Sequence, residues 1–218
     1  FNSNNFWFQA MGTNDYANLV GNPSGYNFNV SNPGAIVNEG NLSLNPGKDL
    51  TLTGGTVINT GELSTSGGNI TIAAVNGGDT LRISQPGHLL SLEVVSRIED
   101  ISNLETLSLP ELLTGGDIDH ASSVVINAQG NLELTDTAGV AIASGNINVS
   151  DTSNGSVGGQ VNVLGDRVAV IDANINANGP KVGGTILIGG DFQGNGIVPN
   201  SQQTFVNNNS IISADAIN

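Results

Sequence analysis

The sequence lacks cysteine altogether, which excludes a disulfide scaffold, a cysteine-ligated zinc finger and a thiol nucleophile. Basic residues are scarce, since 5 Lys and Arg stand against 19 Asp and Glu and the formal net charge is −14. Nucleic acids and anionic membranes are bound through basic patches, so this balance argues against both as partners. No apolar run is long enough to span a membrane, and no signal peptide is visible at the start.

Charged residues make up only 11% of the chain and aromatic residues only 4%. Neither a charge-rich disordered segment nor a helical domain with a large aromatic core fits these values. Apolar residues nevertheless reach 38%, and the 30 glycines are roughly twice the usual share. The chain can therefore fold, either around one core or as a stacked repeat array.

Short triplets of apolar, polar and apolar residues recur at intervals of about seven or eight residues, and this alternation is typical of strands with one buried face. The first series is Leu42–Leu44, Leu50–Leu52, Val57–Ile58, Leu63, Ile70–Ile72 and Leu81–Ile83. The second is Val124–Ile126, Leu132–Leu134, Val140–Ile142, Ile147–Val149, Val161–Val163, Val168–Val170 and Ile175–Ala177. Gly-Gly, Gly-Asn and Asn-Pro-Gly segments between the triplets have turn chemistry.

Longer repeats indicate the length of one coil. Asn146–Asn148 recurs as Asn174–Asn176, and Gly158-Gly159 recurs as Gly183-Gly184. Three short strands with their turns fit between one copy of such a segment and the next. This repeat length predicts an all-β fold, a parallel β-solenoid. An antiparallel sandwich is the alternative, but its strands are usually longer and place aromatic residues in the core. Stacked coils should also carry asparagine ladders in their turns.

The pattern divides the chain into an aromatic-rich start with the first coils (1–83), an excursion from the solenoid (84–122) and further coils (123–218). In the excursion, Ser108–Glu111 has capping-box spacing and predicts a short helix. Seven of the nine aromatic residues cluster at the start, namely Phe1, Phe6, Trp7, Phe8, Tyr16, Tyr26 and Phe28. A packing patch over a coil is favoured over an exposed platform for sugar rings.

Few residues could support catalysis or bind a metal. The best acid–base group is Asp166, Arg167 and Asp172, but neighbours in a strand point to opposite faces. Asp117, Asp119 and His120 form the densest potential metal cluster, which is read as solvated loop charges, and His88 as a turn residue. No nucleophile elbow or phosphate-binding loop occurs, so we expect no catalytic, cofactor-binding or metal residues and no cofactor.

Five sequence segments, taken in their order and spacing, are characteristic of a known family. They are Gly21–Phe28, Asn32–Asn38, Arg82–Glu93, Leu109–Gly116 and Gly189–Gly194. Together they resemble the secretion-domain region of filamentous-haemagglutinin-like two-partner secretion exoproteins, in particular the large cyanobacterial ones. The resemblance covers nearly the whole chain.

This resemblance implies a right-handed parallel β-helix, export through an outer-membrane secretion pore, and display at the cell surface as a structural or adhesive filament segment. Its implied partners are that pore, surface or matrix glycans and proteins, and neighbouring copies. The alternative is a carbohydrate-active β-helix enzyme, a polysaccharide lyase or hydrolase.

The ends of the sequence add two further expectations. Since the chain opens on Phe1, we read it as a processed or interior piece. The segment Ile211–Asn218 resembles a coil still in progress, so we expect the parent chain to continue, with these residues forming about nine or ten coils of a rod.

Overall fold

The computed structural model describes residues 2–3, 6–9, 13–18, 23–31, 33–77, 80–82, 123–126, 132–135, 139–195 and 198–217. Most of the ordered elements are short β-strands, and one short 3-10 turn, η2, spans Phe192–Gly194. Within these residues no helix is long and apolar enough to cross a membrane.

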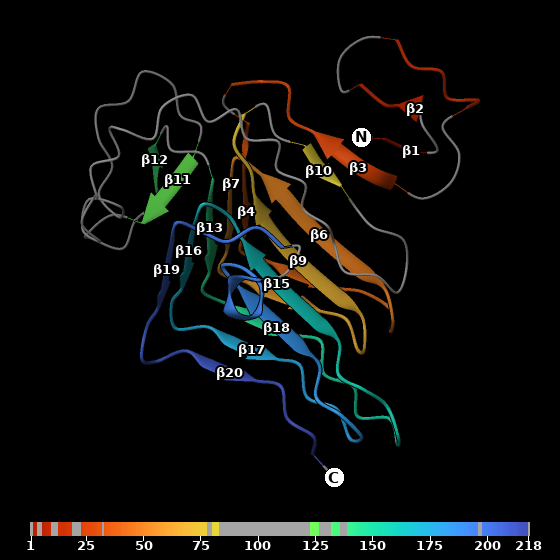
Figure 1. Cartoon of the computed structure of the whole chain (residues 1–218), viewed down its shortest axis with the longest axis vertical. Coiled ribbons are helices and arrows are strands. Elements are labelled where there is room, and N and C mark those ends of the chain that lie inside the picture. The colour runs from red at the N-terminus through yellow and green to blue at the C-terminus, as the bar shows by residue number, and fades with distance from the viewer. Residues whose placement is uncertain are drawn as a thin grey trace.

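Three sheets are built entirely from parallel strands, and the chain visits them in a fixed order (Figure 1). The first sheet holds β4 (Ala35–Asn38), β7 (Thr56–Asn59), β13 (Val140–Ala143), β16 (Arg167–Val170) and β19 (Gln203–Val206). The second holds β5 (Asn41–Ser43), β8 (Glu62–Ser64), β14 (Asn146–Asn148), β17 (Asn174–Asn176) and β20 (Ile211–Ser213). The third holds β6 (Asp49–Gly54), β9 (Asn69–Ala74), β15 (Gln160–Leu164) and β18 (Thr185–Ile188).

The chain is therefore a parallel β-helix, as the triplet spacing predicted. Each coil contributes one strand to each sheet, and each strand pairs in register with its equivalent in the next coil. The repeated Asn-Ile-Asn segments are such equivalents, because Asn146–Asn148 pairs with Asn174–Asn176 residue by residue. A right-handed winding, which the resemblance implies, is also the hand that crossovers between parallel strands adopt.

The number of coils is smaller than predicted. The described residues form four complete coils and the first two strands of a fifth, so the estimate of nine or ten is wrong. That estimate assigned nearly every residue to the stack. Strand β13 pairs directly with β7, however, so the chain between β9 and β13 leaves the stack and returns without adding a coil.

Three segments that were predicted to form coil strands pair antiparallel instead. Strand β10 (Thr80–Arg82) joins β1 (Asn2–Ser3), β2 (Phe6–Trp7) and β3 (Pro23–Asn27) in a four-stranded sheet. Strands β11 (Ser123–Ile126) and β12 (Leu132–Thr135) pair with each other. Side chains alternate in the same way in parallel and antiparallel strands, so the triplets alone could not separate the two. The helix predicted at Ser108–Glu111 lies outside the described residues.

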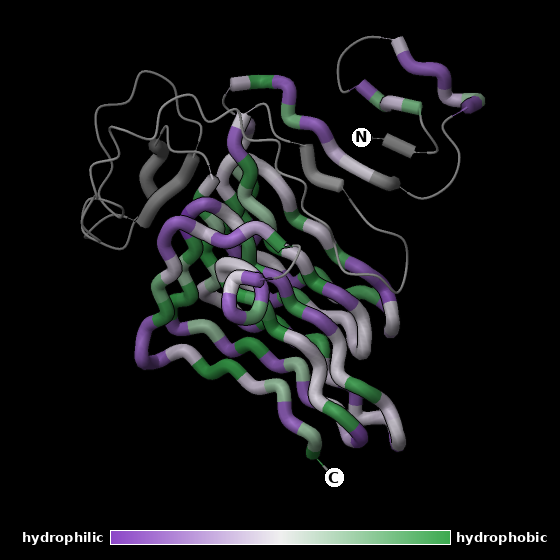
Figure 2. Tube along the Cα trace, viewed as in Figure 1, coloured by the Kyte–Doolittle hydropathy of each residue, from purple (hydrophilic) through white to green (hydrophobic). Residues whose placement is uncertain are grey.

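Inward-facing aliphatic side chains form rows along the axis of the stack. In the second sheet, Leu63, Ile147 and Ile175 are in register and fully buried. The same row ends at Leu42 and Ile212, which are 38% and 42% exposed. Figure 2 shows the resulting alternation of hydrophobic and hydrophilic residues along the strands. A coil thus completes its core only when another coil covers it on each side.

The corners of the coils are fixed by stacked glycines and asparagines. A Cβ atom at Gly159 would lie 2.1 Å from the Gly68 carbonyl oxygen, and one at Gly184 would lie 1.9 Å from the Gly159 oxygen. This close backbone approach explains why Gly-Gly recurs before the strands of the third sheet. At another corner the Asn38 Nδ2 donates to the Asn59 Oδ1 over 2.7 Å in a buried bond, which confirms the expected asparagine ladder.

Candidate functional site

The residues of the best candidate acid–base group, which were not expected to support catalysis, do not converge on one site. Asp166 lies in the turn before β16, where the Asn76 amide donates a hydrogen bond to its carboxylate. Arg167 is half-buried, and burial lowers the pKa of its guanidinium, against the opposing effect of the nearby negative charge of Asp166. Asp172 follows the other end of β16, so the three residues do not form an acid–base pair around one cleft.

Asp172 instead links the fourth and fifth coils. Its carboxylate accepts hydrogen bonds from Asn207 Nδ2 at 2.7 Å and Asn209 Nδ2 at 2.9 Å. The Asn207 Oδ1 in turn accepts from the Asp172 backbone N–H over 3.0 Å. The side-chain hydrogen bonds from Asn207 and Asn209 lower the pKa of the Asp172 carboxyl, and the bond from Asn207 has the larger effect. Asp172 also has a positive φ of 51°, which aspartate tolerates better than most residues.

A metal centre finds no support in the part of the chain that the structure describes, which contains no group of three or more potential ligands among His, Cys, Asp and Glu. Asp117, Asp119, His120 and His88 all lie outside the described residues. Asp151 has a lowered pKa, caused first by the Ser153 backbone N–H that donates to it over 2.8 Å. That bond belongs to a surface turn and needs no ion.

The aromatic residues at the start are more exposed than predicted. Phe6, Trp7 and Tyr16 are 42%, 50% and 68% exposed, so the interpretation as a packing patch is wrong for these three. Phe8 and Tyr16 lie near each other, with ring centroids 6.2 Å apart and a tilted arrangement. Phe1 lies outside the described residues. Phe6, Trp7 and Tyr16 therefore leave a considerable part of their surface to solvent, whereas Phe8, Tyr26 and Phe28 are half-buried.

The outer faces of the first and second sheets differ in chemistry. In the first sheet Ile58 and Ile142 point outward in register and are buried, and the neighbouring strand β11 contacts β7. In the second sheet the outward positions are mainly asparagine and serine, as in Asn146 and Asn148. Strands that are buried on both faces lack the regular alternation of polar and apolar residues. The sequences of Thr56–Asn59 and Val140–Ala143 already show this lack of alternation.

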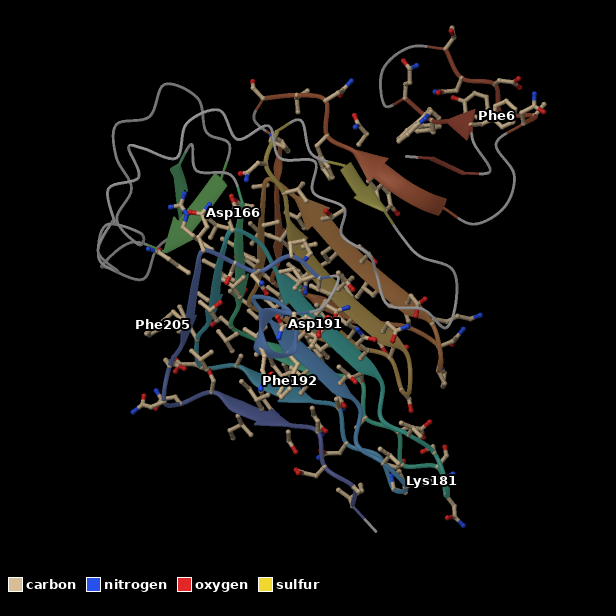
Figure 3. All side chains as sticks on the ribbon, in the orientation of Figure 1. Phe6, Asp166, Lys181, Asp191, Phe192 and Phe205 are labelled. Carbon is tan, nitrogen blue, oxygen red and sulfur yellow. The ribbon has the colours of Figure 1, made fainter. Side chains whose placement is uncertain are left out.

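After β13, the longest connection between two strands of the stack runs from β18 to β19. It covers residues 189–202, and we call it the Phe192 loop. Phe192 is 78% exposed at η2, and Figure 3 shows it beside Asp191 and well away from Phe6 and Lys181. Val198, from the same loop, is only 3% exposed. Among its described residues, the loop thus has a buried anchor, Val198, and an aromatic side chain presented to solvent, Phe192.

Hydrogen bonds and unusual backbone conformations define the shape of the Phe192 loop. The Asp191 Oδ1 accepts from the Phe192 N–H at 2.8 Å, and the Asn200 Nδ2 donates to the Gly194 carbonyl at 3.1 Å. Gln193 has a positive φ of 54°, a strained conformation that the surrounding bonds maintain. Loops held in this way on a rigid scaffold commonly carry binding residues.

From the sequence alone, Gly189–Gly194 contributes only to the family resemblance and has no predicted role. Two features could have singled it out. The connection from β18 to β19 is longer than the other turns of the fourth coil, and Phe192 is one of the few aromatic residues outside the start. An isolated aromatic residue in a glycine-rich insertion favours a surface contact over a core position.

The fold and these outer features define the chain as a parallel β-helix protein. No protein-family model matches its sequence, and no curated protein matches it. Among solved structures it is similar to the HMW1 secretion domain from Haemophilus influenzae, with 21% sequence identity and a TM-score of 0.34. The match covers 84% of this chain and 51% of the other, so the chain spans about half the length of that structure.

Proposed function

We propose that this chain is a segment of a secreted surface protein of the two-partner secretion type, in which the parallel β-helix serves as a structural or adhesive rod. The observation that carries the proposal is the in-register stack of coils with short, laddered corners. Such a stack extends in one direction and leaves its longer connections on the outside. The sequence phrases that resemble two-partner secretion exoproteins support the same assignment.

Export through an outer-membrane pore suits the physical character of the chain. It has no cysteine that could form disulfides on the way. Each coil contacts only its neighbours, so folding can propagate coil by coil as the chain emerges. The proposed partner during export is the pore, and the proposed location afterwards is the cell surface or the extracellular medium.

Export is tested by expressing the complete parent reading frame with and without its cognate outer-membrane pore. We expect the product to be digested by protease added to intact cells only when the pore is present. Equal digestion in both strains, or intracellular retention in both, would refute the assignment to this secretion route.

An adhesive role is the finer part of the proposal, and the Phe192 loop is its most suitable contact. An aromatic ring that is held by a shaped loop loses little conformational entropy on binding, and aromatic residues dominate binding energies at interfaces. Candidate receptors are surface or matrix glycans and proteins. The neighbouring Asp191 adds a carboxylate that accepts a hydrogen bond from the Phe192 backbone N–H.

Adhesion is tested by measuring the binding of the chain to immobilised matrix proteins and to a glycan array. We expect Phe192→Ala to weaken binding about tenfold, which corresponds to about 1.4 kcal/mol. Phe205→Ala is the matched control, because Phe205 is also partly exposed but lies in β19 of the stack. Equal losses in both variants would argue against a specific role of the loop.

We also propose that the chain is not an enzyme, since Asp166 and Asp172, the acids of the best candidate group, engage separate structural partners. Incubation with pectins, alginate, chitin fragments and sulfated glycans should yield no new reducing or unsaturated ends. Cleavage that is lost in Asp166→Asn would overturn this view and favour the carbohydrate-active alternative.

A further inference from the structure

Four asparagines are followed by glycine, namely Asn76, Asn154, Asn178 and Asn195. In such pairs the backbone nitrogen of the glycine can attack the asparagine side chain, because glycine has no Cβ atom to shield the approach. Gly196, which follows Asn195, lies outside the described residues. The structure surrounds the other three asparagines very differently. We propose that Asn154 is a site of spontaneous deamidation in the folded protein, whereas Asn76 and Asn178 are protected from it.

The reaction needs no group beyond the chain and water. The Gly155 backbone N–H gives its proton to a solvent base, and the nitrogen forms a bond to the Asn154 Cγ. The bond from Cγ to the side-chain nitrogen then breaks, and that nitrogen leaves as ammonia with a proton from solvent. Water opens the resulting five-membered imide at either carbonyl, which yields aspartate or isoaspartate.

The turn at Asn154 leaves both reacting groups accessible. Asn154 and Gly155 are exposed, and neither the Asn154 side chain nor the Gly155 amide has a hydrogen-bond partner among the described residues. Gly155 has a positive φ of 78°, and no atom lies within 4 Å of a Cβ position built there. The backbone bond that closes this turn runs from the Ser156 N–H to the Ser153 carbonyl, at 3.0 Å, and the Ser153 N–H donates to the Asp151 carboxylate at 2.8 Å. Neither bond involves Asn154 or Gly155. The backbone can therefore move into the attacking geometry without breaking a bond of Asn154.

In the Asn178-Gly179 pair, hydrogen bonds hold both reacting groups, the asparagine side chain and the glycine backbone nitrogen. The Asn178 Oδ1 accepts hydrogen bonds from the Ser213 hydroxyl at 2.7 Å and the Asp215 N–H at 2.6 Å. The Gly179 N–H, which would be the nucleophile, donates to the Asp215 carbonyl over 3.1 Å. Gly179 is also buried. Deamidation here requires the chain of the fifth coil to separate first.

The Asn76-Gly77 pair is held in a different way. The Asn76 side chain donates to the Asp166 carboxylate, which links the segment after β9 to the turn before β16. A Cβ atom at Gly77 would lie 2.1 Å from the Ser31 carbonyl oxygen, so the backbone of Gly77 is closely packed. Rotation of the Asn76 amide toward the Gly77 nitrogen breaks the first contact and strains the second.

Deamidation at Asn154 adds a negative charge to the turn that already contains Asp151, whose carboxylate accepts from the Ser153 N–H. The isoaspartate product also inserts an extra methylene group into the backbone between Asn154 and Gly155. The exposed corner between β14 and β15 would thus change in charge and shape with time, while the stacked strands on either side keep their pairing.

The test is prolonged incubation of the folded chain at mildly alkaline pH, followed by peptide mapping with mass spectrometry and separation of the aspartate and isoaspartate forms. We expect conversion at Asn154 to be at least about tenfold faster than at Asn178 or Asn76, because each protected pair must first lose hydrogen bonds. In concentrated urea the three rates should approach one another. Asn154→Gln, whose longer side chain closes a less favoured ring, should abolish the main product.

Two results would overturn the proposal. One is conversion of Asn178 or Asn76 in the folded chain at the rate of Asn154. The other is a preference for Asn154 that persists unchanged in urea, since the selectivity would then come from the local sequence and not from the fold.

Discussion

Replacement of Ile147 by alanine should destabilise the protein far more than the same replacement at Ile212. Both residues belong to one inward row of the second sheet. Ile147 is fully buried between Leu63 and Ile175, whereas Ile212 is 42% exposed in the last described coil. The comparison therefore isolates the effect of being covered by coils on both sides.

The expected magnitudes follow from this difference in burial. Isoleucine-to-alanine replacements in closed cores cost about 2–5 kcal/mol, because they remove buried methyl groups and leave a cavity. Full burial of an isoleucine side chain contributes only about 1.5–3 kcal/mol, and the partly exposed Ile212 can lose no more than a part of this. We expect about 3 kcal/mol for Ile147→Ala and about 1 kcal/mol for Ile212→Ala.

The assay is urea unfolding followed by circular dichroism in the β-strand region. Ile147→Ala should lower the midpoint strongly, while Ile212→Ala should change it little and loosen only the last coil. Equal shifts of the midpoint for the two variants would refute the reasoning, because the row would then not gain its stability from coils stacked on both sides.

Three further predictions concern the corners of the coils. Gly145→Ala should destabilise by about 1–3 kcal/mol, since a Cβ atom there would lie 1.9 Å from the Gly61 carbonyl oxygen, and a lowered urea midpoint would show it. Asn59→Ala should cost about 1–3 kcal/mol in the same assay, because the buried Asn38 Nδ2 loses its 2.7 Å bond to Asn59 and keeps only the longer bond to the Gly40 carbonyl, at 3.2 Å. Asp172→Asn tests pH dependence. Hydrogen bonds lower the pKa of Asp172, so its stabilisation is present above the ordinary aspartate pKa of about 3.9 and disappears as pH falls through the lower folded value. The difference in melting temperature between wild type and this variant should therefore shrink on acidification, and a constant difference would contradict the argument.

The sequence predicted the stack well where local chemistry repeats in every coil. The recurrence of Asn146–Asn148 at Asn174–Asn176, and of Gly159 at Gly184, reflects positions that contact each other across coils. A backbone approach that excludes a Cβ atom requires glycine in consecutive coils, and this requirement is visible as a repeat. For these corners the pattern alone was enough to predict the fold.

The prediction from the sequence was wrong where the same alternation of apolar and polar residues occurs in strands that pair antiparallel outside the stack. Val124–Ile126 and Leu132–Leu134 look like coil strands but form the antiparallel β11–β12 pair, since neither alternation nor apolar content encodes strand direction. One clue was present. Ile58 and Ile142 place aliphatic side chains on the outer face as well, and strands buried on both faces need a neighbour outside the stack.

The position of the candidate site follows from which parts of the solenoid can vary in sequence and length without disturbing the stacked coils. Coil corners are constrained by contacts on both sides, as at Gly159. The Phe192 loop is tied to the stack at its two ends, where the Gly189 and Gln202 N–H groups donate to the carbonyls of neighbouring residues in the coil below, and by the buried side chain of Val198. Replacing residues 189–202 by the two-residue turn Gly165-Asp166, which joins β15 to β16, should therefore leave the parallel sheets intact. We expect a cost of about 1–2 kcal/mol, mostly from losing the burial of Val198, because shortening a loop changes closure entropy only slightly. Binding to matrix proteins or glycans should fall as in Phe192→Ala. A variant that folds with the same strand content and binds undiminished would place the contact elsewhere on the solenoid, and collapse of the strand content would show that the loop supports the stack.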